Sequence, residues 1–122
     1  MTIRVVIIDD NGQFLAAARD LLERQGIEVV AVATNGTEGR RLVADVGPDC
    51  VLVDVDLGVE SGFDIAEQLF ADENARVVLI SAYSETEFAD LITASPALGF
   101  IAKTRLSGET IMEMLDGEGA TT

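Results

Sequence analysis

Polar side chains of three kinds follow the apolar runs of this sequence. Asp9 and Asp10 follow the run VVII, and Asp54 ends the run CVLVD. Ser81 follows the run VVLI, and Lys103 follows GFIA. A buried carboxylate is costly unless it is paired or bound to a cation. Three carboxylates gathered near one ammonium group would suit a hard divalent cation, Mg²⁺ or Mn²⁺, which prefers oxygen ligands.

The elements that must position these residues alternate along the chain. Runs rich in Val and Ile with little alternation are typical of strands that are covered on both faces. The sequence contains five such runs: Val5–Ile8, Ile27–Ala33, Cys50–Val55, Val77–Ile80 and Leu98–Ala102. The stretches between them show helical spacing of apolar residues and residues that favour helix ends.

Five helices are therefore predicted. The first places its apolar residues on one face and ends near Gly26, and the second begins near Asn35 or Thr37 and ends before Gly47. The other three should start after Ser61, at Ser84 with Glu87 as a capping box, and after Ser107 as N-cap.

A strict alternation of strands and helices predicts parallel strands joined by right-handed crossovers. The expected fold class is α/β, with a doubly wound, flavodoxin-like, five-stranded parallel sheet in the order 2-1-3-4-5 and helices on both faces. The carboxyl ends of strands 1, 3, 4 and 5 would then meet at one crevice, where this architecture binds ligands. One domain is expected over residues 1–116, followed by a frayed tail over residues 117–122.

Composition excludes several classes of function. The chain carries 22 acidic and 8 basic residues, a net charge of −14, which argues against direct binding of nucleic acid. It has no histidine, which excludes histidine-based catalysis and most zinc sites. Cys50, the only cysteine, is expected to be a buried thiol. The segment MTIRVVIIDD is no signal peptide, and no apolar run is long enough to span a membrane, so a cytoplasmic protein is expected.

The motifs VVIIDD, VLVDVDLGVESG, VVLISA and GFIAK resemble those of the receiver domains of two-component response regulators, and the resemblance covers nearly the whole chain. It implies that Asp54 is the phosphoacceptor. It also implies that Mg²⁺ is held by Asp10 and Asp54 directly, by Asp9 mainly through water, and by the backbone carbonyl of Asp56.

The same resemblance assigns the remaining site residues. Ser81, Ala82 and Lys103 would bind the phosphoryl group, with Ser81 also acting in the switch. Phe100, three residues before the lysine, would be the switch aromatic. Asp56 and Tyr83, each two residues beyond a site residue, would tune the lifetime of the aspartyl phosphate.

The resemblance further implies partners. A sensor histidine kinase or a phosphotransfer protein would supply the phosphoryl group from a phosphohistidine in phosphorelay signal transduction. The fourth predicted helix, the run Leu98–Ala102 and the fifth helix would form the switched partner-binding face, and a homodimer through it is possible. Such a chain is a signalling switch rather than an enzyme, with at most self-phosphorylation from small donors and autodephosphorylation.

The chain also departs from the family. Leu57-Gly58 stands where the family usually has Met-Pro, Thr104 stands where a proline usually follows the lysine, and Phe100 stands where tyrosine is frequent. A degenerate receiver that acts only as a binding module is therefore an alternative.

A second alternative is an enzyme. VLVDVDLG resembles the DxD motif of haloacid-dehalogenase-like phosphatases, with Asp54 as nucleophile and Asp56 as acid/base. The order of the motifs argues against it, because in that family the DxD motif ends the first strand and the metal-binding acids follow the lysine.

Overall fold

Five parallel strands form the centre of the computed structural model, which describes residues 2–120, with side chains over residues 2–117. They pair in the order β2-β1-β3-β6-β7. Their bounds are Arg4–Ile8 for β1, Glu28–Ala33 for β2, Cys50–Asp54 for β3, Val77–Ser81 for β6 and Gly99–Ala102 for β7. Because β6 and β7 are the fourth and fifth long strands along the chain, the predicted order 2-1-3-4-5 and the doubly wound α/β fold are confirmed.

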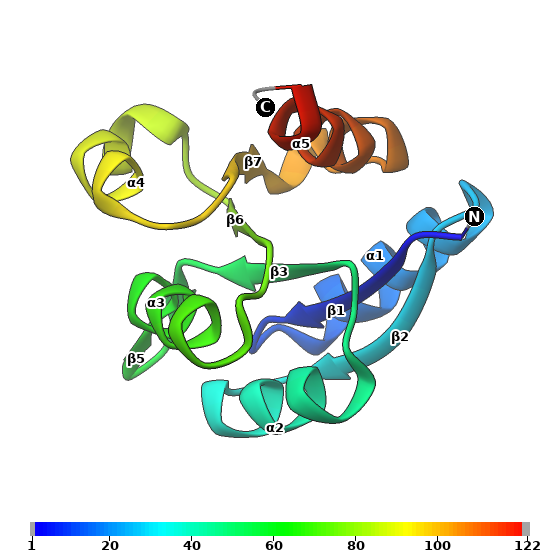
Figure 1. Ribbon diagram of the computed structural model, residues 1–122, viewed down its shortest axis with the longest axis horizontal. Coiled ribbons are helices and arrows are strands. Elements are labelled where there is room, and N and C mark those ends of the chain that lie inside the picture. Colours follow the sequence, from blue (N-terminus) through cyan, green and yellow to red (C-terminus); the bar gives the residue numbers. More distant parts are fainter. Residues whose placement is uncertain (1, 121–122) are drawn as a thin grey trace.

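Helices cover both faces of this sheet (Figure 1). The helix bounds are Gly12–Arg24 for α1, Gly36–Val46 for α2, Gly62–Glu73 for α3, Ala89–Ala94 for α4 and Gly108–Ala120 for α5. Buried side chains of α1 and α5 share one core cluster, and those of α2 and α3 share the other, against which α4 also packs. The strand residues alternate between the two clusters, since Val5 and Ile7 belong to the first and Val6 and Ile8 to the second.

Both faces of the central strands are therefore buried, which explains their continuous apolar runs. Every residue of β3 and β6 is buried. Cys50 lies in this core with no exposed surface, as predicted, and burial raises the pKa of its thiol to about 12.

Side-chain caps fix where most helices begin. Of the two predicted starts of the second helix, Asn35 is the right one, and its side chain caps the helix by accepting from Glu38 N. The predicted cap at Ser61 is confirmed, since its hydroxyl accepts from Phe63 N. The Ser107 hydroxyl accepts from Thr110 N at 3.1 Å at the start of α5. These residues accept hydrogen bonds from backbone N–H groups that have no partner within the helix, and they thereby fix where each helix begins.

The fourth helical segment starts after Ser84 as predicted, but its predicted capping box was wrong. The chain first forms the 3₁₀ helix η1, Glu85–Phe88, and only then the short α4. The Ser84 side chain caps nothing, because its hydroxyl lies 2.9 Å from that of Thr86. Glu87 N instead donates to the backbone carbonyl of Ser84 at 3.1 Å. The expected capping box of Ser84 and Glu87 is therefore absent.

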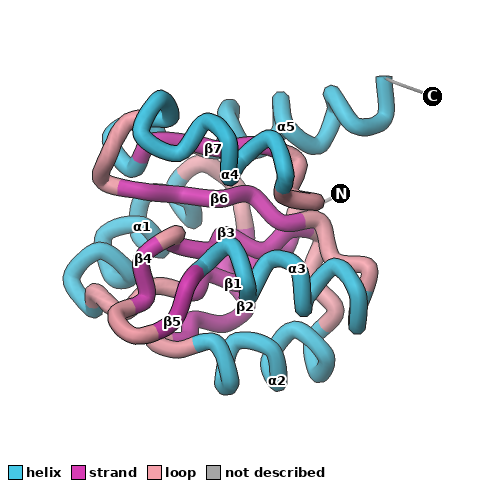
Figure 2. Tube along the Cα trace, turned by 90° about the vertical axis from the view of Figure 1, so that its left-hand side faces the viewer, coloured by secondary structure: helices cyan, strands magenta, loops and turns pink. Residues whose placement is uncertain are grey.

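A small hairpin follows β3 and was not predicted (Figure 2). It pairs β4, Asp56–Leu57, with β5, Glu60–Ser61, around Gly58, whose φ of 74° favours glycine. The Glu60 carboxylate accepts from Gly36 N at 3.0 Å and so ties the hairpin to the start of α2. Strands of two residues are too short to show a periodic pattern in the sequence.

The last helix reaches Ala120, so the segment expected to fray, residues 117–122, contains the end of α5. Residues 121–122 lie outside the described part of the chain. The peptide bond between Lys103 and Thr104 is trans. Over the described residues, no helix combines the length and apolar character that crossing a membrane requires.

Candidate functional site

The predicted site residues meet at the carboxyl ends of neighbouring strands. Asp9 follows β1 directly, Asp54 ends β3, Ser81 ends β6 and Lys103 follows β7. The parallel register sets Asp54 beside Ile80 and Ser81 beside Ala102, so these ends lie level with one another. The sheet topology therefore brings together residues that are up to 94 positions apart in the sequence.

Three carboxylates form the acidic part of the site. Oxygen atoms of Asp9, Asp10 and Asp54 all lie within 4.8 Å of one another. Asp9 is fully buried, Asp54 is 6% exposed and Asp10 is exposed. Asp9 Oδ2 is buried and has no hydrogen bond of regular geometry among the described residues. This set of three carboxylates offers only oxygen ligands, which fits a hard divalent cation such as Mg²⁺.

Lys103, the only lysine of the chain, neutralises part of this charge. Its Nζ lies 2.7 Å from Asp9 Oδ2 and 3.1 Å from Asp54 Oδ2. It also lies 4.3 Å from the centroid of the Phe14 ring. The lysine side chain is only 16% exposed, so these contacts are screened little by water.

The pKa values of Asp54 and Lys103 are both raised, but for different physical reasons. Burial raises the pKa of Asp54 above its ordinary value, although the N–H of Asp56 and the ammonium of Lys103 partly oppose this shift. Burial on its own lowers the pKa of Lys103, but the pull of Asp9 and Asp54 outweighs that effect and leaves its pKa raised. Lys103 is therefore a permanent cation at neutral pH.

Backbone groups orient the two buried carboxylates. Asp54 Oδ1 accepts from Asp56 N at 3.1 Å, which leaves Oδ2 beside the lysine. Asp9 Oδ1 accepts from Asn11 N at 2.9 Å. The start of α3 lies close against this strand end, because a Cβ on Gly62 would overlap the carbonyl oxygen of Asp54. Only glycine fits there, which explains the glycine that follows the Ser61 cap.

The loop after β6 carries the predicted hydroxyl. Ser81 is buried, and its Oγ accepts from Tyr83 N at 3.0 Å, so its hydroxyl hydrogen is available to a ligand. Ala82 follows it and is exposed. Tyr83 is 58% exposed, and Asp56 is exposed on the hairpin. Both residues proposed to tune phosphate lifetime thus lie on the solvent side.

An aromatic cluster connects the switch residue to other elements. The Phe88 ring lies 6.5 Å from that of Phe100, 5.9 Å from that of Phe63 and 6.5 Å from that of Tyr83, between ring centroids. Phe100 is already buried, with 8% of its surface exposed. Sequence reasoning missed the roles of Phe14 and Phe88, because neither has a spacing that separates it from ordinary core residues.

Comparison with known proteins identifies the family. A sequence model of the response regulator receiver domain matches residues 5–116. A protein-glutamate methylesterase/protein-glutamine glutaminase of Haloarcula marismortui is 33% identical over 113 residues, which are 92% of this chain. The chain spans only 30% of that relative's length. Chemotaxis protein CheY of Thermotoga maritima is 31% identical over 101 residues, which are 82% of this chain and 84% of that protein.

A solved structure agrees with these matches. It is the crystal structure of a response regulator protein from Burkholderia pseudomallei with a phosphorylated aspartic acid, calcium ion and citrate. It is 27% identical to this chain, with a TM-score of 0.77, and the match covers 93% of this chain and 66% of that one. The phosphatase alternative receives no support from these comparisons.

Proposed function

This chain belongs to the response regulator receiver domain family, and from that premise we propose that Asp54 is its phosphoacceptor. The observation that carries the proposal is the position of Asp54 Oδ2, which lies 3.1 Å from Lys103 Nζ. The same carboxylate lies within 4.8 Å of Asp9 and Asp10. A nucleophile placed between a metal-binding pair and a fixed ammonium is suited to phosphoryl transfer.

The metal-binding roles follow from exposure and from the family pattern. Asp10 and Asp54 would hold Mg²⁺ or Mn²⁺ directly, Asp9 chiefly through water, and the backbone carbonyl of Asp56 would complete the protein ligands. A bound divalent ion supplies positive charge against the phosphoryl oxygens. Asp9 is the least suited to be the main direct ligand, because it is fully buried and its Oδ2 is already 2.7 Å from Lys103.

The transfer itself needs little from the protein beyond position and charge. An oxygen of Asp54 attacks phosphorus of a phosphohistidine on a sensor kinase or a phosphotransfer protein. The new P–O bond forms as the P–N bond breaks, and the bonding electron pair stays on the imidazole nitrogen. Lys103 neutralises charge on a phosphoryl oxygen, and the hydroxyl of Ser81 and the N–H of Ala82 donate hydrogen bonds to the phosphoryl group.

The phosphorylated state would be read through Ser81 and Phe100. A hydrogen bond from Ser81 to the phosphoryl group draws that hydroxyl toward Asp54 and opens space beside β6. Phe100 is already buried, so its response is a change of packing rather than a change of exposure. The Phe88 ring centroid lies 6.5 Å from that of Phe100, and Phe88 is the last residue of η1, so it would carry the change to η1 and α4.

Incubation with acetyl phosphate and Mg²⁺ tests the proposal. We expect a phosphoryl adduct that maps to Asp54 by mass spectrometry, that disappears in Asp54→Asn and that requires the divalent ion. Asp64→Asn, an exposed acid of α3, is the matched control and should still react. An adduct that persists in Asp54→Asn, or that forms equally with a chelator present, refutes the assignment. Absence of any adduct with intact folding would favour the binding-module alternative.

A further inference from the structure

The hairpin of β4 and β5 borders the candidate metal site at two points. Asp56, the first residue of β4, carries the backbone carbonyl that is proposed to bind the divalent ion. The turn of the hairpin lies near the exposed acid of the pair, because a Cβ on Gly58 would lie 3.7 Å from Asp10 Oδ2. The position of the hairpin therefore decides where one of the proposed ligands lies.

Several features would leave this hairpin loose if it stood alone. Each of its strands has only two residues, and an isolated two-stranded hairpin is marginally stable at best. Gly58 stands where the family usually has proline, and glycine loses more backbone freedom when it is ordered. Val59 at the tip is fully exposed, so its side chain is not buried against the fold. Contacts with other elements must therefore hold the hairpin in place.

Two side chains connect the hairpin to the rest of the fold. Leu57 of β4 is buried in the core cluster that α2 and α3 share. Glu60 of β5 reaches α2, where its Oε1 accepts from Gly36 N at 3.0 Å. Figure 2 shows β5 next to the loop that leads into α2. The other side-chain hydrogen bonds of the hairpin stay within residues 54–63, so Glu60 is its polar link to an element outside its own loop.

The start of α2 has a free donor and enough room for this carboxylate. The Gly36 N–H is one of the first amides of the helix, which have no partner within it, and the Asn35 side chain accepts from Glu38 N instead. A Cβ on Gly36 would overlap Ile65 and would lie 2.7 Å from Glu60 Oε2, so only glycine leaves the carboxylate its place. The negative charge of Glu60, which is half-buried, also meets the positive end of the helix dipole.

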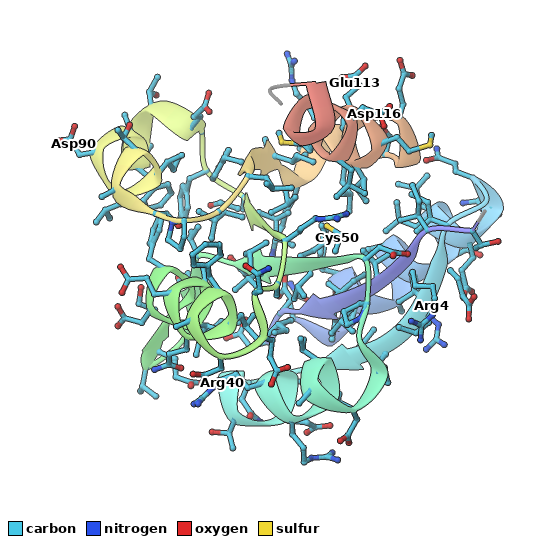
Figure 3. All side chains as sticks on the ribbon, viewed as in Figure 1. Arg4, Arg40, Cys50, Asp90, Glu113 and Asp116 are labelled. Carbon is cyan, nitrogen blue, oxygen red and sulfur yellow. The ribbon has the colours of Figure 1, made fainter. Side chains whose placement is uncertain are left out.

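The helix α2 is in turn packed against the sheet and against α3. A Cβ on Gly39 would overlap Ile8 of β1, so this helix lies close against a central strand. Arg40 pairs with Asp72 of α3 at 3.4 Å, and Figure 3 shows Arg40 on the side of α2 that faces α3. Glu60 therefore joins the hairpin to a helix that the core holds in place.

We propose that Glu60 is a positioning residue of the metal site. Its hydrogen bond to Gly36 N holds β5, and through β5 it holds the Asp56 carbonyl where that group can bind the divalent ion. The antiparallel pairing of the two strands transmits the effect, since Leu57 pairs with Glu60 and immediately follows Asp56. The inference rests on the proposed function, because the ligand role of Asp56 belongs to that proposal.

The size of the effect follows from the fraction of molecules whose hairpin is in the binding position. The apparent dissociation constant of a ligand rises in proportion as the fraction of protein in the binding conformation falls. Glu60→Ala removes the carboxylate that accepts from Gly36 N. If the binding fraction drops to roughly one third to one tenth, Mg²⁺ affinity falls roughly three- to tenfold.

Calorimetric titration with Mg²⁺ and NMR spectra of the metal-free chain test the proposal. Glu60→Ala should bind Mg²⁺ roughly three- to tenfold more weakly than the parent. Without metal, the amides of Gly58 and Gly62 should exchange with solvent faster in this variant, and the Gly36 amide resonance should shift. Glu60→Gln keeps an oxygen acceptor, so its Mg²⁺ affinity should stay within about twofold of the parent value. A loss in Glu60→Gln equal to that in Glu60→Ala would overturn the inference.

Two control variants separate positioning from helix stability and from charge. Asn35→Ala removes another cap of α2, so it should lower Tm without weakening Mg²⁺ binding. Glu38→Gln removes an exposed charge from the first turn of the same helix, and Mg²⁺ affinity should stay near the parent value. If either control weakens Mg²⁺ binding as much as Glu60→Ala does, the effect is general and the inference is overturned.

The outcomes also separate this inference from the proposed function. Failure of Mg²⁺ to bind the parent would refute the metal site and, with it, this role of Glu60. Mg²⁺ binding of equal strength in the parent and in Glu60→Ala would refute the role of Glu60 alone. Weaker Mg²⁺ binding in Glu60→Ala with unchanged amide exchange in the hairpin would refute that role as well, because the position of the hairpin would then not have changed.

Discussion

The ammonium nitrogen of Lys103 lies 4.3 Å from the centroid of the Phe14 ring. The cation of the site thus rests on an aromatic face as well as beside two carboxylates. Phe14 belongs to the first turn of α1, where its N–H donates to the Asn11 side chain at 3.1 Å. Asn11, the cap residue that follows the acid pair, therefore also helps to position the Phe14 ring against the Lys103 ammonium.

The first prediction concerns this contact. Phe14→Leu keeps an apolar side chain but loses the attraction between ring and cation, worth about 0.5 to 2 kcal/mol. We expect weaker Mg²⁺-dependent beryllofluoride binding in Phe14→Leu, and recovery in Phe14→Tyr, measured by NMR titration. If Tyr loses as much as Leu, the ring contributes packing only. Thermal unfolding of each variant checks that the fold is retained.

The second prediction separates the roles of the acid pair in Mg²⁺ binding. Asp10 is exposed, so Asp10→Asn should lower Mg²⁺ affinity with little change in the free energy of unfolding. Asp9 is buried against Lys103, so Asp9→Asn should affect unfolding more and direct Mg²⁺ binding less. Calorimetric titration and thermal melts measure both quantities. The reverse pattern would exchange the two assignments.

The third prediction follows from the raised pKa of Asp54. Between its unfolded and folded pKa values the folded state holds a proton that the unfolded state has released, so stability falls as pH rises through that interval. Above it, ionised Asp54 destabilises the fold. Without divalent ions, Asp54→Asn should therefore raise Tm by a few degrees near neutral pH, with a smaller gain at acid pH. Equal differences in Tm at every pH would contradict this.

The fourth prediction tests the close approach at the end of β3. Gly62→Ala would force its Cβ to overlap the carbonyl oxygen of Asp54. Overpacking against backbone should cost about 1 to 3 kcal/mol and displace the Asp54 side chain. Chemical denaturation and beryllofluoride binding measure the two effects. Gly12→Ala, where a Cβ meets nothing within 4 Å, is the control and should change neither.

The fifth prediction concerns the lifetime of the phosphorylated state. Tyr83 is 58% exposed and Asp56 is also exposed, so both can meet water that approaches Asp54. Tyr83→Ala should speed dephosphorylation by removing an obstacle, and Asp56→Asn should slow it by removing a group that orients water. Loss of the adduct with time measures the rates, with Val59→Ala at the hairpin tip as control. Rates equal to the parent in both variants would show that neither side chain takes part.

Local sequence patterns determined the strands, most helix starts and the strand order of this protein. Val and Ile runs marked the strands, Asn35, Ser61 and Ser107 marked helix starts, and strict alternation selected the parallel order. These signals are readable because they depend on neighbours within one turn or one strand. The order of acid pair, acid, hydroxyl and ammonium along the chain then predicted that Asp54 and Lys103 lie at one edge of the sheet.

Only the tertiary structure decided which side chains and segments pack around these strands and around the site residues. Phe14 under the lysine and Phe88 against Phe100 depend on how separate helices pack on the sheet, which no local spacing encodes. The 3₁₀ helix η1 stands where the capping box was expected, and the Ser84 hydroxyl contacts that of Thr86 instead of a backbone N–H. A groove of about 490 Å³ beside β7 likewise exists only where η1 and α5 meet the sheet edge, because residues distant in sequence become neighbours through folding alone.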